Sequence, residues 1–484
     1  MNYLNPFRFL TMLLCLLPLS VLCSKEEMAI PADGFAFSSD IKLTSEEEKA
    51  DFLIDSLRNI LISEKGRDWG LFRSFVGYRD EARQSKLYRV IRSMPKGGLL
   101  HIHSSAACDA DWLIDRAISM PDCYVYWGDK NQAAVKGELR FFHGETVPPG
   151  WSRIQELKAT HAGLVEELHQ LYTLGDEDQS VSNIWEEFED IFARTGYMTS
   201  YRPVFVDYCL HCFNTMAEDG VLFAEVRTGL NAITNEDGTQ SVNEKLLDVW
   251  REVARQVKMN HPSFVISVIA ANSKGNTLEN VSEDVTRINA LKKKYPDLIV
   301  GYDLVAEEDA GNSNGFYSTA LKKSEAPLFL HAGESLQKSN TNIQDAIDLG
   351  AQRIGHGTNL YYFPFLEKEI IEKDILLEVC PISNQALRYV PDFRLHPAIR
   401  YLQDGVQISL SSDDPMIFQS SLLTDDYFVA YLSWGLNLRS MKKMLLNSIS
   451  HSGMNKTDKQ AQLALFDEKW KTFIQNLNSG AITQ

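Results

Sequence analysis

The sequence predicts an α/β protein built as a (β/α)8 barrel, also called a TIM barrel, with an N-terminal helical extension and a small domain inserted after the first barrel strand. Three observations lead to this prediction. Short apolar runs typical of buried strands alternate with helical stretches, which indicates a parallel sheet. Eight such runs occur, the number that closes a barrel of this kind. Polar residues cluster after the C-terminal end of each run, where these barrels keep their chemistry.

The overall composition fits an ordinary globular chain with a large hydrophobic core. The chain has 484 residues, of which 44% are hydrophobic. Its net charge of -17 argues against nucleic acid as a partner, because phosphate binding needs clustered Lys and Arg.

The first element is a secretory signal at residues 1–23. Arg8 precedes an apolar run from Phe9 to Leu22, which is too short to span a bilayer comfortably and contains Pro18. No other segment approaches the roughly 20 apolar residues of a membrane helix. We therefore expect a secreted protein without a membrane span, extracellular or in the lumen of a secretory or lysosomal compartment.

The glycosylation sequons agree with export, whereas the cysteine count is sparse for a secreted protein. Glycosylation sequons begin at Asn280 and Asn455. Five cysteines remain once the signal is removed, an odd number that allows at most one or two disulfides. These are Cys108, Cys123, Cys209, Cys212 and Cys380.

Residues 24–94 are expected to form a helical segment. Thr44 and Glu47 have the spacing of a capping box. Leu53, Leu57, Ile60 and Leu61 then fall on one helical face. We expect this stripe to pack against a second chain in a two-fold dimer; the alternative is that it packs on its own barrel.

The barrel is expected to comprise residues 95–108 and 183–475. Its first strand, LLHIH, is separated from the second, VLFAEVR, by far more residues than a usual connection. Residues 109–182 are therefore interpreted as a small inserted domain. The remaining strands are SFVISVIAA, LIVGYDLV, PLFLHAGE, AQRIGHG, ILLEVCPIS and VQISLSSDD.

The strand ends predict a zinc site. His101 and His103 are two apart in a strand, so both side chains point into the barrel mouth. Together with His331 and Asp413 they make a site with three nitrogens and one oxygen, completed by a water. Asp414 would face the other way and contact a ligand, and the cation would offset the repulsion between the two carboxylates.

The main alternative is that His101 and His103 are merely buried, hydrogen-bonded histidines, as in most isolated H-x-H pairs. Against this alternative, short polar motifs stand at the ends of five different predicted strands, all on one face of the fold. Besides the first and last strands, these are HAGE at 331–334, GHG at 355–357 and CPISN at 380–384.

A second candidate metal site combines the H-x-E of residues 143–145 with the C-x-x-C of residues 209–212, as in zinc cytidine-type deaminases. That pattern carries a proline before its first cysteine, where this chain has Tyr208. PVFVDYCLHCFNTM has the period of an amphipathic helix, in which small buried cysteines are common. A redox C-x-x-C is also possible but lacks a thioredoxin-like setting.

Five motifs carry a family resemblance in the order expected, from about residue 90 to 470. MPKGGLLHIH, LFLHAGES, RIGHGTNL, EVCPISNQAL and SSDDP closely resemble the secreted adenosine deaminases of the adenosine deaminase 2 type, also called adenosine deaminase-related growth factors. The resemblance implies hydrolytic deamination of adenosine, or of a related adenine nucleoside, to an inosine-type product and ammonia. It also implies a homodimer formed through residues 24–94, and a receptor-binding domain at 109–182 whose partner is a cell-surface receptor or glycosaminoglycan.

The same resemblance assigns roles to single residues. It places one Zn²⁺ per subunit on the four ligands named above. Glu334 would donate a proton to purine N1, His356 would orient and deprotonate the attacking water, and Asp414 would bond to N7. Trp185 resembles a tryptophan that leans over the ribose, although a core tryptophan on a helix face is the alternative.

Two departures from the family pattern affect substrate binding. Ser104 and Ser105 stand where relatives have an aspartate that anchors the sugar hydroxyls. Ala306 stands where relatives have a glycine whose N–H approaches purine N3. These changes predict deaminase chemistry on an altered nucleoside, modified at the ribose or base; the alternative is an ordinary adenosine deaminase.

Two other classes of function were weighed. A binuclear amidohydrolase would need a bridging lysine or carboxylate at the fourth strand and further histidines, but DLVAEED offers neither lysine nor histidine. A growth-factor-like secreted ligand would be free to lose Glu334 or His356, and the chain keeps both.

Overall fold

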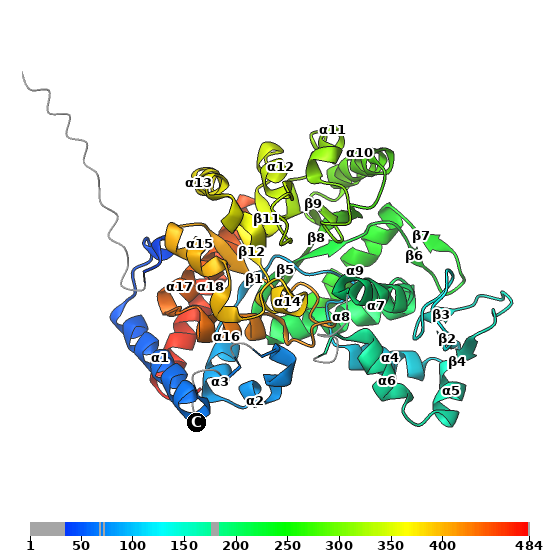
Figure 1. The fold of residues 1–484 in the computed structure, drawn as a ribbon, viewed down its shortest axis with the longest axis horizontal. Coiled ribbons are helices and arrows are strands. Elements are labelled where there is room, and N and C mark those ends of the chain that lie inside the picture. Colours follow the sequence, from blue (N-terminus) through cyan, green and yellow to red (C-terminus); the bar gives the residue numbers. More distant parts are fainter. Residues whose placement is uncertain (1–33, 67–68, 71–72, 176–182, 483–484) are drawn as a thin grey trace, which may run out of the picture.

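The structure is a computed structural model, drawn in Figure 1. It describes residues 34–66, 69–70, 73–175 and 183–482. The predicted signal at residues 1–23 lies outside the described residues. No helix in these ranges combines the length and apolarity that a membrane crossing requires.

Parallel strands form the centre of the molecule. They make two four-stranded sheets, with orders β1-β5-β8-β9 and β10-β11-β12-β13. Isolated bridges join the sheets at both edges, because Tyr302 pairs with Leu328 and Ile102 pairs with Asp413. Each of the eight predicted runs overlaps one strand, so the predicted barrel is confirmed. The strands are β1 (Gly97–Leu99), β5 (Val221–Thr228), β8 (Val265–Ser273), β9 (Ile299–Val305), β10 (Phe329–Ala332), β11 (Arg353–His356), β12 (Leu376–Val379) and β13 (Ile408–Leu410).

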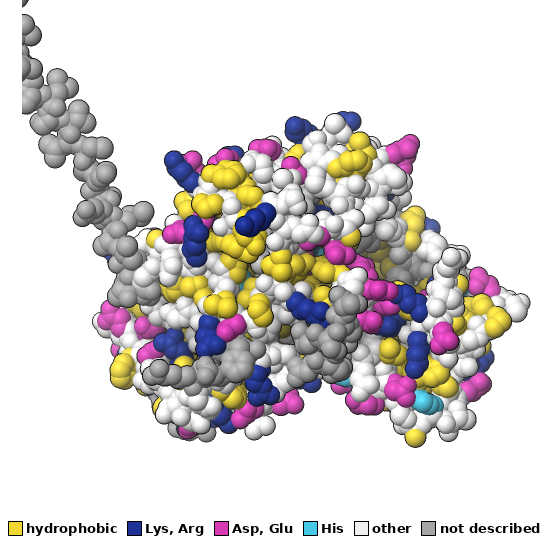
Figure 2. All heavy atoms as spheres, viewed as in Figure 1, with side chains coloured by type: hydrophobic (Ala, Val, Ile, Leu, Met, Phe, Trp, Pro, Cys, Tyr) yellow, Lys and Arg dark blue, Asp and Glu magenta, His cyan; other side chains and the backbone are white. Residues whose placement is uncertain are grey.

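Helices surround the strands, and most of them bury one apolar face, whereas α16 (Leu422–Ser433) is buried on all sides. In α9 (Glu244–Asn260), Leu246, Trp250, Val253 and Val257 recur at helical spacing and are buried. The other outer helices are α10 (Leu278–Lys294), α11 (Ser318–Leu321), α12 (Asn342–Asp348), α13 (Pro364–Glu372), α14 (Pro381–Ala386), α15 (Ala398–Asp404), α17 (Leu438–Ser450) and α18 (Lys456–Asn478). On the face in Figure 2, Lys and Arg are interspersed with Asp and Glu.

The N-terminal extension contains α1 (Ser45–Lys65), α2 (Arg79–Arg83) and α3 (Lys86–Ser93). The predicted capping box between Thr44 and Glu47 is present at the start of α1. α1 packs along α18 and also contacts α17 and α3, at the left of Figure 1.

This packing bears on the apolar stripe of α1. Leu61 is buried, and Leu53 and Leu57 are partly buried against the chain's own core. Of the four residues of the stripe, Ile60 faces outward, 52% exposed. The chain's own core, including contacts with α18, therefore covers part of the stripe, and packing of the stripe on a second chain stays a prediction.

The inserted segment lies at the right of Figure 1. A three-stranded antiparallel sheet of order β3-β2-β4 packs with three helices. α7 (Ile184–Thr199) and α8 (Arg202–Glu218) then lead back to β5. The elements of the insert are α4 (Ala110–Ser119), β2 (Cys123–Tyr126), β3 (Leu139–Phe141), β4 (Trp151–Arg153), α5 (Ile154–Thr160) and α6 (Leu164–Tyr172), and a short hairpin, β6 (Ile233–Thr234) and β7 (Gln240–Ser241), follows β5.

Candidate active site

Closure of the barrel brings the first and last predicted ligand motifs together. The His103 N–H donates to the Asp413 carbonyl at 3.1 Å, and the Asp413 N–H donates to the His101 carbonyl at 3.1 Å. Asp413 has a φ of 58°, a strained conformation that this local pairing holds. Gly355, in the next sheet, leaves room for the His101 ring, since a Cβ there would lie 2.8 Å from its Cε1.

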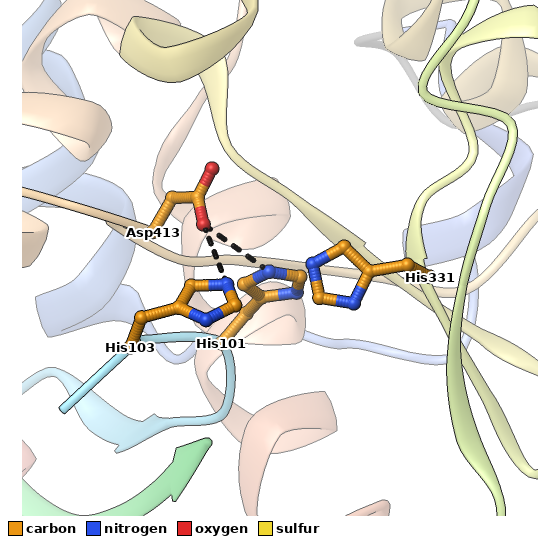
Figure 3. Close-up of side chains that lie close together, drawn as sticks. All are labelled: His101, His103, His331 and Asp413. Atoms are coloured by element: carbon orange, nitrogen blue, oxygen red, sulfur yellow. Dashed lines mark ion pairs between the residues drawn. The ribbon is translucent and has the colours of Figure 1, made fainter. Parts of the chain in front are cut away.

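Four side chains converge at this point (Figure 3). Asp413 Oδ1 lies 3.3 Å from His101 Nε2 and 3.2 Å from His103 Nε2. The ligand atoms of these three residues and His331 all lie within 4.8 Å of one another. His101 Nε2 is buried and has no hydrogen-bond partner, an arrangement that costs free energy unless a cation takes its lone pair. The donor set of three imidazoles and one carboxylate fits Zn²⁺.

A second layer of carboxylates orients two of the histidines. His101 Nδ1 lies 2.9 Å from Glu378 Oε2, and His331 Nδ1 lies 2.7 Å from Asp303 Oδ2. Metal-binding histidines usually make such a contact through the second ring nitrogen, because it fixes the tautomer and directs Nε2 to the metal. Arg227 ties the two carboxylates together, donating to each at 2.6 Å.

A second arginine, Arg353, extends this buried network through two ion pairs. Arg353 Nε lies 2.6 Å from Glu378 Oε1, and its Nη1 donates to Glu225 Oε2 at 2.6 Å. Burial acts to raise the pKa of Glu378, but Arg227 and Arg353 outweigh it and hold that pKa well below its usual range. Glu378 is therefore a carboxylate, able to accept from His101.

These supporting residues were missed in the sequence. The available signal was a charged residue inside an apolar strand: Arg227 in VLFAEVR, Asp303 in LIVGYDLV and Glu378 in ILLEVC. A buried charge is expensive unless it is paired, so these three residues inside strands of one barrel indicate a buried ionic network.

His356 and Glu334 form a pair beside the four ligands. His356 Nδ1 lies 3.6 Å from Glu334 Oε1, and neither atom has a hydrogen-bond partner. Burial, reinforced by the Asp413 carboxylate, raises the pKa of Glu334 well above its usual value. Burial, reinforced by His101, lowers the pKa of His356 well below its usual value. The pair therefore combines a carboxyl group that resists ionisation with an imidazole that resists protonation.

The two adjacent aspartates face different partners. Asp413 directs Oδ1 at the histidines and accepts from Ser383 Oγ at 2.8 Å through Oδ2. Burial opposes ionisation of Asp413, but the nearby rings of His101 and His103 outweigh it and lower its pKa. For Asp414, burial and then the Asp413 charge raise the pKa well above its usual value. The pair thus avoids two neighbouring bare charges.

A cavity of about 350 Å³ opens beside this cluster. α7 forms one wall with Trp185, Phe188 and Phe192, whose helical spacing could have identified this face in the sequence. Trp185 Nε1 donates to Tyr389 Oη at 2.8 Å, which fixes the indole at the wall. The cavity brings together ten residues singled out in the sequence: His103, Ser104, Ser105, Trp185, Ala306, His331, Glu334, His356, Asp413 and Asp414. His101 is buried behind them.

The alternative metal site of the sequence does not assemble. Cys209 and Cys212 are buried in α8, as the helical pattern predicted. In the described part of the chain, neither His143 nor Glu145 joins a group of converging metal-ligating side chains. The described cysteines are all free thiols.

Comparison with known proteins agrees with this geometry. The adenosine deaminase family model matches residues 161–469. "Adenosine deaminase 2" from Dictyostelium discoideum is 30% identical over 467 residues, which cover 93% of this chain and 86% of that protein. "Adenosine deaminase 2" from Sus scrofa is 30% identical over 469 residues, covering 90% and 91% respectively. A solved amidohydrolase from Burkhoderia ambifaria with bound Zn superposes with a TM-score of 0.60 at 15% identity, over 81% of this chain and 95% of that one, a likeness of fold alone.

Proposed function

Because the chain belongs to the adenosine deaminase family and is an adenosine-deaminating hydrolase, we propose that it is a secreted, zinc-dependent enzyme of the adenosine deaminase 2 type. Its substrate is adenosine or a closely related adenine nucleoside, and its products are an inosine-type nucleoside and ammonia. The observation that carries the proposal is the convergence of His101, His103, His331 and Asp413 at a cavity that also holds an acid and a base.

The four converging side chains would hold one zinc ion per chain. Zinc in such a site makes water a nucleophile at neutral pH by lowering its pKa toward about 7. Glu378 and Asp303 keep the ring nitrogens of His101 and His331 in the tautomer that can bind the ion.

The remaining polar groups divide the proton transfers between them. His356, held neutral by burial, accepts a proton from the water that adds to purine C6. Glu334 carries a proton at neutral pH and donates it to purine N1. Asp414 contacts N7, a hydrogen-bond acceptor, and a carboxyl that keeps its proton can donate to it. Water is consumed and ammonia leaves.

A pair of variants tests the proposal. Glu334→Gln should keep zinc but lower kcat by about 10²–10⁴, the usual contribution of one positioned acid. His331→Ala should lose both zinc and activity. Zinc content by elemental analysis and deamination by loss of adenosine absorbance are the measurements. Full activity in Glu334→Gln, or stoichiometric zinc in His331→Ala, would refute the assignment.

Secretion and homodimer formation are parts of the same proposal. Export is supported by the secretory signal that the sequence predicts at residues 1–23. A homodimer is supported by two exposed apolar side chains of α1, Phe52 at 73% and Ile60 at 52% exposure. Binding of a receptor or glycosaminoglycan by residues 109–182 rests on the family resemblance.

A further inference from the structure

A second group of metal-ligating side chains lies outside the active cavity, where the start of α4 meets α8. Cys108 and Asp109 directly precede α4, and His211 lies within α8. One ligand atom from each lies within 4.8 Å of the other two. Asp109 Oδ2 is 3.0 Å from His211 Nε2 and accepts from the Cys108 thiol at 3.5 Å. Sulfur, nitrogen and oxygen donors are thus gathered in one small volume.

Each of these three residues is held by a second contact. Asp109 caps α4, since its Oδ1 accepts from the Trp112 N–H at 2.8 Å and leaves Oδ2 for the cluster. The His211 ring stacks on Trp112, with ring centroids 5.2 Å apart and planes 11° apart. The Cys108 N–H donates to Tyr208 Oη at 3.2 Å. Supporting contacts of this kind fix the ligands of a metal before it binds.

The spacing of the donors matches a tetrahedral zinc site. With ordinary zinc bond lengths, a nitrogen and an oxygen ligand lie about 3.3 Å apart, and a sulfur and an oxygen ligand about 3.5 Å apart. The observed separations are 3.0 Å and 3.5 Å. Zinc binds the thiolate form of cysteine and the neutral form of histidine, so both ligands release their protons when the ion binds.

We propose that Cys108, Asp109 and His211 bind a second zinc ion, separate from the active site, with water as the fourth ligand. A thiolate combined with an imidazole favours zinc over Mg²⁺ or Ca²⁺, which take oxygen ligands. A cavity of about 240 Å³ has Cys108 and Asp109 on its wall. Through this cavity a water molecule could reach the fourth coordination position of the proposed zinc. The ion clamps the first helix of the insert to the helix that leads into the second barrel strand.

Metal counting on the full-length protein tests the site. After dialysis with zinc and removal of loosely bound ions, the wild type should hold about two zinc ions per chain. His211→Ala should hold about one, and so should His331→Ala, each having lost a different ion. Asp109→Asn keeps the helix cap, since Asn also accepts the Trp112 N–H, but should release the second zinc. Cys212→Ser, which removes no proposed ligand, is the matched control and should keep both.

Cobalt substitution gives an independent signature. Co²⁺ bound to Cys108 should show a thiolate-to-metal charge-transfer band in the near ultraviolet, which three histidines and an aspartate cannot produce. Cys108→Ser should abolish the band. Cys380→Ser should retain it, which separates the second site from the buried thiol near His356 and Asp413. Deaminase activity retained by His211→Ala and Cys108→Ser shows that these variants are folded.

Three outcomes would overturn the second site. One zinc in the wild type and none in His331→Ala would leave the proposed active site standing and remove the second. Two zinc ions retained in His211→Ala would show that the ion lies elsewhere. A disulfide between Cys108 and Cys212, found by peptide mapping without reduction, would show that the thiol is consumed by oxidation instead of metal binding.

Discussion

Ala306 occupies a backbone position that suits glycine. Its φ is 82°, in the left-handed region where a Cβ costs about 1–2 kcal/mol. It lines the substrate cavity, as does Ser104, whose hydroxyl donates to Thr228 Oγ1 at 3.1 Å. The two departures from the family pattern therefore lie on the wall of one cavity, which Glu334 and His356 also line.

Placing the family's residues at both positions tests whether these positions determine substrate choice. Ser104→Asp with Ala306→Gly should raise kcat/KM for adenosine by about ten-fold or more, because one hydrogen bond to a charged group contributes about 1.5–3 kcal/mol. The comparison covers adenosine, 2′-deoxyadenosine, 5′-modified adenosines and N6-methyladenosine. If the wild type already prefers adenosine and the double variant does not improve on it, these positions do not set specificity.

At the scale of single elements, α1 is held to the barrel through its capping glutamate. Glu47 Oε2 accepts from the Thr44 N–H at 2.8 Å, while Oε1 accepts from Lys442 Nζ and Trp470 Nε1, each at 2.6 Å. Burial acts to raise the pKa of Glu47, but the bonds from Lys442, Thr44 and Trp470 outweigh it and leave the pKa lowered. One side chain thus joins α1, α17 and α18.

This arrangement predicts a pH-dependent stability. A lowered carboxyl pKa contributes stability above the unfolded value of 4.5 and loses it as the pH falls through the folded value. Glu47→Gln should therefore lower the free energy of unfolding by about 1 kcal/mol at pH 7, with little difference remaining near pH 3. Urea unfolding at pH 7 and near pH 3 measures this difference in the free energy of unfolding. Glu48→Gln, exposed in the same turn, is the control, and an equal loss at both pH values would contradict the account.

The strands and the four side chains that converge at the barrel mouth could be predicted because both leave local patterns. Buried parallel strands are apolar runs, and the ligands follow directly after them, as His331 follows PLFL. The packing of α1 on α18 could not be predicted, because it depends on a partner helix far along the chain. The roles of Arg227, Asp303 and Glu378 depend on which strands become neighbours, so only the closed barrel reveals them.

At the scale of the whole molecule, Arg227 links the two four-stranded sheets from inside the barrel. It lies in β5 and pairs with Asp303 in β9 and Glu378 in β12. Arg227→Met should lower the free energy of unfolding by about 3–5 kcal/mol, because two buried carboxylates lose their partner. Zinc affinity should fall by about 10–100-fold, since those carboxylates orient His101 and His331.

A surface pair provides the control for this prediction. Arg251 and Asp297 are 3.1 Å apart and exposed, so Arg251→Met should change stability by less than about 1 kcal/mol. Denaturant unfolding and competition with a zinc chelator give the two readouts. An Arg227→Met protein with unchanged zinc affinity would show that the network does not orient the ligands.

The quaternary prediction depends on the outer face of α1. Phe52→Glu with Ile60→Glu should convert a dimer to a monomer, because both side chains are exposed on the chain itself. Met259→Glu, a substitution of a 65% exposed residue in α9, should leave the mass unchanged. Light scattering coupled to gel filtration measures the mass, and a double variant that remains dimeric would place the interface elsewhere.

Closure of the barrel between Ile102 and Asp413 also bears on how the enzyme matures. Its proposed ligands come from positions 101 to 413, so the ribosome must release most of the chain before any ion can find a complete set of donors. Contacts of such long sequence separation form late and slowly. An ion that binds the finished barrel and not its precursors stabilises only the finished form by mass action. Zinc supply during export would then set the yield of mature enzyme, and metal content would report how much of a preparation has completed folding.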